Sequence, residues 1–245
     1  MKSMFINAGF QPLPALELEL TAFALHGSRE LVHPEPPGRD IYSWRGFEEY
    51  DPLHAESVNL KALLHHSETA TTEITLGTRR RSVDYEGINY RAGGRVDEYS
   101  LEDYEYTLGI MHSREITDSN TLRFGATYNR WRAPEGKRFY VGQEMDIHSG
   151  ALVIADEQDL GRLTLDGALK IRQNYYSRYA PATFQVSGKR IIGAQLRKEW
   201  GDPLGDASLG ATYRLSKLMN LYSHVTAGRL EVPPGAVNVK GKSLT

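Results

Sequence analysis

The chain has 245 residues, a formal net charge of -2 at pH 7 and no cysteine. That charge argues against a general nucleic-acid binder, whose phosphate contacts need a basic face. The absence of cysteine excludes disulfides, catalytic thiols and thiolate metal sites. Apolar runs of about eighteen residues are also absent, so the sequence predicts no transmembrane helix.

The first third of the chain predicts a strand between two irregular stretches. Residues 1–14 are predicted to be a proline-bounded lead. In residues 15–26, leucine and alanine fall on one side of an extended chain and glutamate and threonine on the other. Residues 27–55 carry several prolines and aromatic residues, and are predicted to form one long functional loop.

The same alternation of apolar and polar residues returns along the rest of the chain. In residues 119–131 and 161–172 it is most regular, with one apolar and one polar face in each, and Leu122, Phe124, Ala126 and Tyr128 are predicted to share the apolar face of the first. Residues 147–157 alternate less cleanly, so their faces stay unassigned. Residues 190–200 are interpreted as a β-extension of the preceding loop rather than a full strand. The remaining alternating segments are 57–66, 72–85, 99–112, 207–215 and 220–229.

Connection lengths between these segments follow a rhythm. Short connections such as SETAT, SREITDSN, QDLG and SKLM alternate with long ones over residues 27–55, 86–98, 132–146 and 175–206. Outer-membrane barrels have short periplasmic turns and long extracellular loops. The fold class predicted is therefore all-β, a partial antiparallel transmembrane β-barrel of about nine or ten strands. A soluble sandwich makes the same alternating pattern, and that alternative stays open.

Chemistry-bearing motifs are sparse. The eight histidines show no metal-ligand spacing, and His65 and His66 point to opposite faces of a strand. Adjacent carboxylates occur, but nothing positions them for acid and base roles. Neither a nucleophile elbow nor a phosphate-binding glycine loop is found. The sequence therefore predicts no enzyme, no metal site and no cofactor.

Basic and aromatic residues in the predicted long loops are the candidates for binding an anionic, partly aromatic ligand. Arginine supplies charge and planar donors, and tyrosine supplies a stacking surface. The alternative is a solvated rim, which is also where the triplet Arg79, Arg80 and Arg81 is expected. The candidate residues are Trp44, Arg45, Arg132, Lys137, Arg138, Tyr140, Tyr175, Tyr176 and Arg178.

Three segments resemble the barrel of TonB-dependent outer-membrane receptors. LRFGATYNRWRAPEGKRFYVG (122–142) resembles the family's strands that run into extracellular loops, and DEQDLGRLTLDGALKI (156–171) resembles a frequent turn-and-strand segment. ASLGATYRLSKLMNLYSHVTAGRLEVPPG (207–235) is the most specific, because residues 209–234 match a family hairpin in order and spacing. Gln158 departs from the pattern, since the family usually has tryptophan there.

The resemblance implies a barrel of about 22 antiparallel strands, of which residues 1–245 supply an internal portion, with the family's plug domain absent. It also implies energised uptake of a scarce nutrient, most often a ferric siderophore, across a Gram-negative outer membrane. The partners implied are outer-membrane lipid, a small-molecule or metal-chelate ligand, and the TonB energy-transducing complex, reached through the missing plug region. A passive porin-like channel or another ligand-binding β-barrel is the alternative.

Overall fold

The computed structural model describes residues 1–30, 45–89, 95–134, 145–179, 183–185, 197–229 and 238–240. Eleven strands in these ranges form one sheet, and two short strands form a separate parallel pair. The prediction of an all-β, antiparallel chain is confirmed, and the main sheet is open, with β1 and β12 at its edges. Within the described ranges there is no helix able to cross a membrane.

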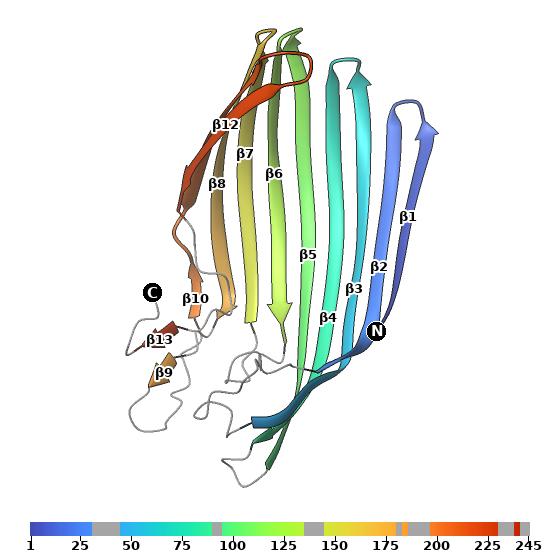
Figure 1. Cartoon of the computed structure of the whole chain (residues 1–245), viewed down its shortest axis with the longest axis vertical. Coiled ribbons are helices and arrows are strands. Elements are labelled where there is room, and N and C mark those ends of the chain that lie inside the picture. Colours follow the sequence, from blue (N-terminus) through green and yellow to red (C-terminus); the bar gives the residue numbers. More distant parts are fainter. Residues whose placement is uncertain are drawn as a thin grey trace.

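Figure 1 shows the main sheet as a single tall layer of strands that run up and down in chain order. Neighbours follow the order β1 to β8, then β11 and β12. The strands are β1 (Lys2–Leu13), β2 (Leu16–Glu30), β3 (Arg45–Ser67), β4 (Ala70–Asn89), β5 (Arg95–Thr117), β6 (Asn120–Ala133), β7 (Met145–Asp159), β8 (Leu163–Tyr179), β9 (Thr183–Gln185), β10 (Arg197–Trp200), β11 (Leu204–Arg214), β12 (Asn220–Gly228) and β13 (Asn238–Lys240).

The prediction that residues 1–14 are only a lead is wrong, because Lys2–Leu13 forms a full edge strand. β1 pairs with β2 in continuous register from Lys2 opposite His26 to Phe10 opposite Leu18. Pro12 falls where this register shifts beside the turn, so its missing N–H does not interrupt the ladder. The main path of the sheet therefore has ten strands.

The strands are longer than the alternation predicted, and the long connections are correspondingly shorter. β2 continues to Glu30 and β3 already begins at Arg45, so much of the predicted 27–55 loop is strand. The predicted loops 86–98, 132–146 and 175–206 lose residues to strands in the same way. Alternation marks only the part of a strand with one apolar face, whereas polar residues paired across the sheet extend the strands beyond it.

Residues 190–200 were predicted to be a β-extension of the preceding loop and not a full strand; residues 190–196 lie outside the described residues, and residues 197–200 form a strand of four residues. β10 pairs with the end of β8, from Arg197 opposite Tyr179 to Trp200 opposite Tyr175. β11 then pairs with the rest of β8, starting with Leu204 opposite Arg172. Both strands thus lie along the same neighbour, and β10 adds no further crossing of the sheet.

The short turns share a local device. In four of them an oxygen of one side chain accepts a hydrogen bond from the backbone N–H two residues later. In the QDLG turn, Asp159 accepts from Gly161 at 2.8 Å, and Gly161 has φ of 84°, which favours glycine. The acceptor and donor residues are Ser67 with Thr69, Thr117 with Ser119, Asp159 with Gly161, and Ser216 with Leu218.

The sheet register collects the apolar side chains on one face. Leu20, Leu60, Leu76 and Leu108 lie directly opposite one another across β2 to β5. The other strands continue this apolar face, and Leu152 of β7 is 66% exposed on it. A second sheet would cover such a face in a soluble sandwich, but the described residues place no layer against it.

The few buried apolar side chains lie on the opposite face, toward the long connections. None of the described large side chains is fully buried. The small core therefore lies on the polar face of the sheet and not on the apolar face. Its apolar members are Val83, Tyr85, Ala133, Met145, Ile147 and Leu204.

Candidate functional site

The nine predicted ligand-binding residues fall into three groups. Trp44, Lys137, Arg138 and Tyr140 lie outside the described residues. Arg45 is the first residue of β3 and pairs with Asn89 of β4. The last group, on β6 and β8, comprises Arg132, Tyr175, Tyr176 and Arg178, which the sheet gathers at the end that carries the long connections.

Asp146 of β7 organises this end of the sheet. Its neighbours in register are Arg132 of β6 and Arg178 of β8. The Asp146 carboxylate accepts two hydrogen bonds from the Arg130 guanidinium, at 2.9 and 2.7 Å. These bonds hold the pKa of Asp146 below its usual range. A carboxylate with only 12% of its side chain exposed thus fixes the Arg130 guanidinium between strands.

Tyr175 and Tyr176 do not present one surface, because consecutive residues of a strand point to opposite faces. Tyr175 lies opposite His148 and belongs to the apolar face. Tyr176 lies opposite Ile147, on the other face. Its ring lies close to Gly201, so that a Cβ atom added to this glycine would be 3.1 Å from the ring. The two tyrosines therefore cannot stack on the same bound ligand.

An aromatic row crosses the apolar face on its long-connection side: Tyr128, His148, Tyr175 and Trp200. Adjacent ring centroids along it are 6.1, 6.0 and 4.8 Å apart. Tyr128 and His148 also share a hydrogen bond of 2.7 Å. Of these four residues, only Tyr175 was among the candidates predicted from the sequence. The signal that could have found the others is an aromatic residue at the end of an alternating run.

A second row lies on the short-turn side of the apolar face. The Thr72 hydroxyl is hydrogen-bonded to His66 at 2.7 Å and to His112 at 2.9 Å. The His112 ring is 5.1 Å from the ring of Phe124. The apolar face is thus bounded on both sides by rows of side chains in which aromatic or imidazole rings stand beside polar atoms.

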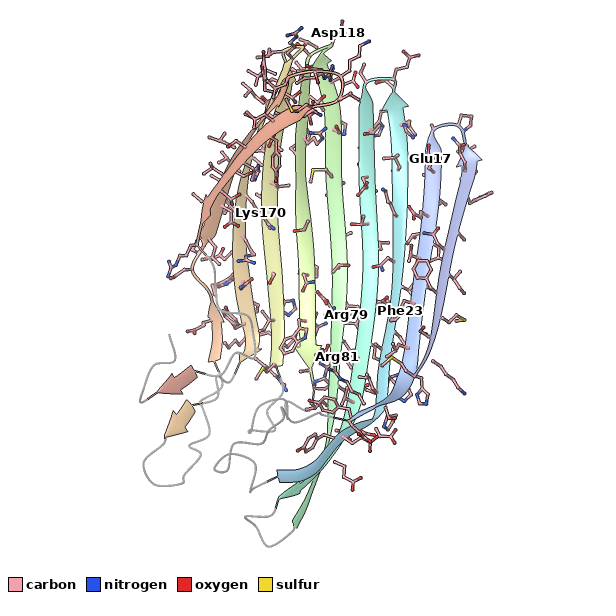
Figure 2. All side chains as sticks on the ribbon, viewed as in Figure 1. Glu17, Phe23, Arg79, Arg81, Asp118 and Lys170 are labelled. Atoms are coloured by element: carbon pink, nitrogen blue, oxygen red, sulfur yellow. The ribbon has the colours of Figure 1, made fainter. Side chains whose placement is uncertain are left out.

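The arginine triplet of β4 is paired with carboxylates of β5. Arg79 meets Glu105 and Arg81 meets Asp103, each at 2.5 Å, while Arg80 meets Glu102 at 2.8 Å. Figure 2 shows Arg79 and Arg81 near one end of the sheet, with Asp118 in a short turn at the other end. The triplet therefore ties two strands together near the long connections.

The polar face carries two adjoining grooves, of about 500 and 370 Å³. Glu19 and Lys61 line both of them. Both grooves are lined mainly by residues of the polar face. The other polar side chains that line the smaller groove are Thr21, Asn59, Thr75 and Thr107.

Within the described ranges, no group of three or more histidine, aspartate and glutamate side chains is arranged to hold a metal ion. Comparison with protein-family models and with curated proteins found no match to the chain. The functional argument therefore rests on the residues and on the geometry of the sheet.

Proposed function

We propose that this chain is part of the β-barrel of a TonB-dependent receptor in a Gram-negative outer membrane, and that it serves energised uptake of a ferric siderophore. The observation that carries the proposal is an apolar sheet face that no layer of the described chain covers and that ring-bearing residues bound on both sides. Lipid-facing bands of outer-membrane barrels have this composition, with an aromatic girdle at each interface.

The dimensions of the apolar face support a membrane location. On β7, His148 and Asp156 flank the outward residues Leu152 and Ile154. His148 and Asp156 are eight residues apart, which is roughly 27 Å along a strand at about 3.4 Å per residue. At a tilt of about 40° this gives a height of roughly 21 Å, close to the apolar band of about 25 Å in such barrels.

The connections support the orientation. Turns of a few residues lie at one end of the sheet, and the longer connections, with the Asp146 arginines beside them, lie at the other. In outer-membrane barrels the longer loops face the exterior. Arg130 and Asp146 share the apolar face with Tyr128 and His148 and lie beyond them, where their charges would be outside the hydrocarbon.

Orientation can be tested directly because the chain has no native cysteine. A cysteine replacing Gly136, between β6 and β7, is expected to react with a membrane-impermeant maleimide on intact cells. A cysteine replacing Asp118, in the short turn between β5 and β6, is expected to react only after the outer membrane is opened. Labelling of Asp118→Cys but not Gly136→Cys on intact cells would invert the orientation.

Transport is tested by uptake of radioactive iron, supplied as a set of ferric siderophores, in cells that lack their own iron receptors. Cells that produce the whole receptor of which this chain is a part are expected to take up at least one chelate, and a protonophore is expected to stop this uptake. Uptake that continues with the protonophore would identify a passive porin-like channel instead. No uptake of any chelate, with the protein present in the outer membrane, would remove the siderophore assignment.

A further inference from the structure

Two histidines that are far apart in the sequence converge on the apolar side of β2 and β3. His26 and His54 are 28 residues apart and lie directly opposite each other in the register. Their Nδ1 atoms are 3.2 Å apart, whereas the ring centroids are 4.5 Å apart with a tilt of 37°. The nitrogen atoms are closer than the ring centres, so the rings converge at their Nδ1 edges.

We propose that His26 and His54 form a two-histidine site for a late first-row transition-metal cation, such as Cu²⁺, Ni²⁺ or Zn²⁺. Imidazole is a preferred ligand of these ions. With metal–nitrogen bonds of about 2.05 Å, a nitrogen separation of 3.2 Å corresponds to a nitrogen–metal–nitrogen angle of roughly 100°. That angle lies between the values of square-planar and tetrahedral coordination, so the observed separation matches two neighbouring ligand positions.

The surroundings leave the remaining coordination positions to water. His26 follows the apolar part of β2, on the long-connection side, and its side chain is exposed. The charged residues of this face around the pair include Lys2, opposite His26 on β1, Glu56, two residues beyond His54, and Arg80, opposite Glu56 on β4. Arg80 is paired with Glu102 at 2.8 Å, so the Glu56 carboxylate can offset part of the charge of a bound cation, whereas Lys2 adds a positive charge beside His26.

A second histidine pair in the same sheet shows what a non-chelating arrangement looks like. Between His66 and His112 the Thr72 hydroxyl is hydrogen-bonded to both rings, whose centroids are 5.8 Å apart. A side-chain oxygen thus occupies the position that a metal ion would need. At His26 and His54 the two Nδ1 atoms are each other's partner at 3.2 Å, and the described contacts place no side-chain oxygen between them.

The site is tested with Cu²⁺ alone, added to the untagged full chain in detergent micelles. Electron paramagnetic resonance is expected to show one tight Cu²⁺ with two nitrogen ligands. His26→Ala and His54→Ala are each expected to weaken Cu²⁺ binding about 100-fold, because the second ligand acts at high effective concentration. Zn²⁺ titration by calorimetry should show the same loss.

His112→Ala is the matched control, since it removes a histidine of the other pair. It is expected to leave the affinity for Cu²⁺ and the two-nitrogen signal unchanged. Equal loss with His112→Ala, unchanged binding in His26→Ala, or no tight Cu²⁺ or Zn²⁺ binding by the native chain would each overturn the site. None of these outcomes depends on siderophore uptake, so this proposal and the proposed function fail separately.

Discussion

Leu152→Arg is expected to lower the partition of the full chain into phospholipid vesicles by roughly 30- to 900-fold. The range corresponds to the cost of about 2 to 4 kcal/mol for an arginine at the bilayer midplane on the lipid face. Leu152 is suited to the test because it lies midway between His148 and Asp156 and is 66% exposed. Flotation of the chain with vesicles at a series of lipid concentrations gives the partition constant.

Thr127→Arg is the matched control on the neighbouring strand. Thr127 lies on the polar face of β6, next to Asn129, which donates a hydrogen bond to Glu105 at 2.7 Å. An arginine at this position would lie on the polar face, near the Glu105 carboxylate. The partition constant should therefore change by less than about threefold. An equal loss in both variants would show that the two faces do not differ in their contact with lipid, and the membrane assignment would fall with it.

The two edge strands are expected to exchange their amide protons at least about 1000-fold faster than β5 when the chain is reconstituted alone in vesicles. β5 is paired on both sides, with β4 and β6. β1 has β2 as its described neighbour and β12 has β11, so about half of their backbone groups face no partner strand. Each such group costs several kcal/mol in hydrocarbon, and the edges are therefore expected to stay in contact with water.

Hydrogen exchange with strand-level resolution measures this difference. The control is β4, which has neighbours on both sides and should match β5. The same preparation is expected to migrate on a gel without the change on heating that a closed barrel shows. Slow exchange in β1 and β12, together with heat-modifiable migration, would mean that the edges are paired and that the isolated chain closes.

The alternation predicted the faces of individual strands well. Leu122, Phe124, Ala126 and Tyr128 were predicted to share a face, and the register places all four on the face that carries Leu108, Ile110, Leu152 and Ile154. These predictions succeeded because side chains alternate strictly along a strand and the middle of one face is apolar.

The segment over residues 147–157 shows where alternation alone is insufficient. Leu152, Val153 and Ile154 are consecutive apolar residues, and no pattern says which of them faces outward. The register decides it, because Leu152 pairs with Ala126 and Ile154 pairs with Phe124 on the apolar face, whereas Val153 lies opposite Gly125 and Lys170. In this segment, pairing with the neighbouring strands determines which side chains lie on the apolar face.

Contacts between distant residues were also out of reach of the sequence. His26 and His54 meet only because the two strands are joined across a long connection in one particular register. Arg132 and Arg178 lie beside the same residue, Asp146, and the sequence did not indicate that these two candidates would come together; their role in ligand binding stays a prediction. The separation of Tyr175 from Tyr176 follows from strand geometry, but only once both residues are known to lie inside β8.

The ten-strand path gives the sheet a polarity. β1 runs toward the end with the short turns, and β12 runs away from it, so the two edges are antiparallel to each other. Any strands inserted between β12 and β1 to close a ring must therefore be even in number, because an odd number would force one parallel pair. By the same parity, two copies joined head to tail, β12 beside β1, keep their turns on one side of a membrane. Antiparallel pairing of β1 with a second β1 would place them on opposite sides.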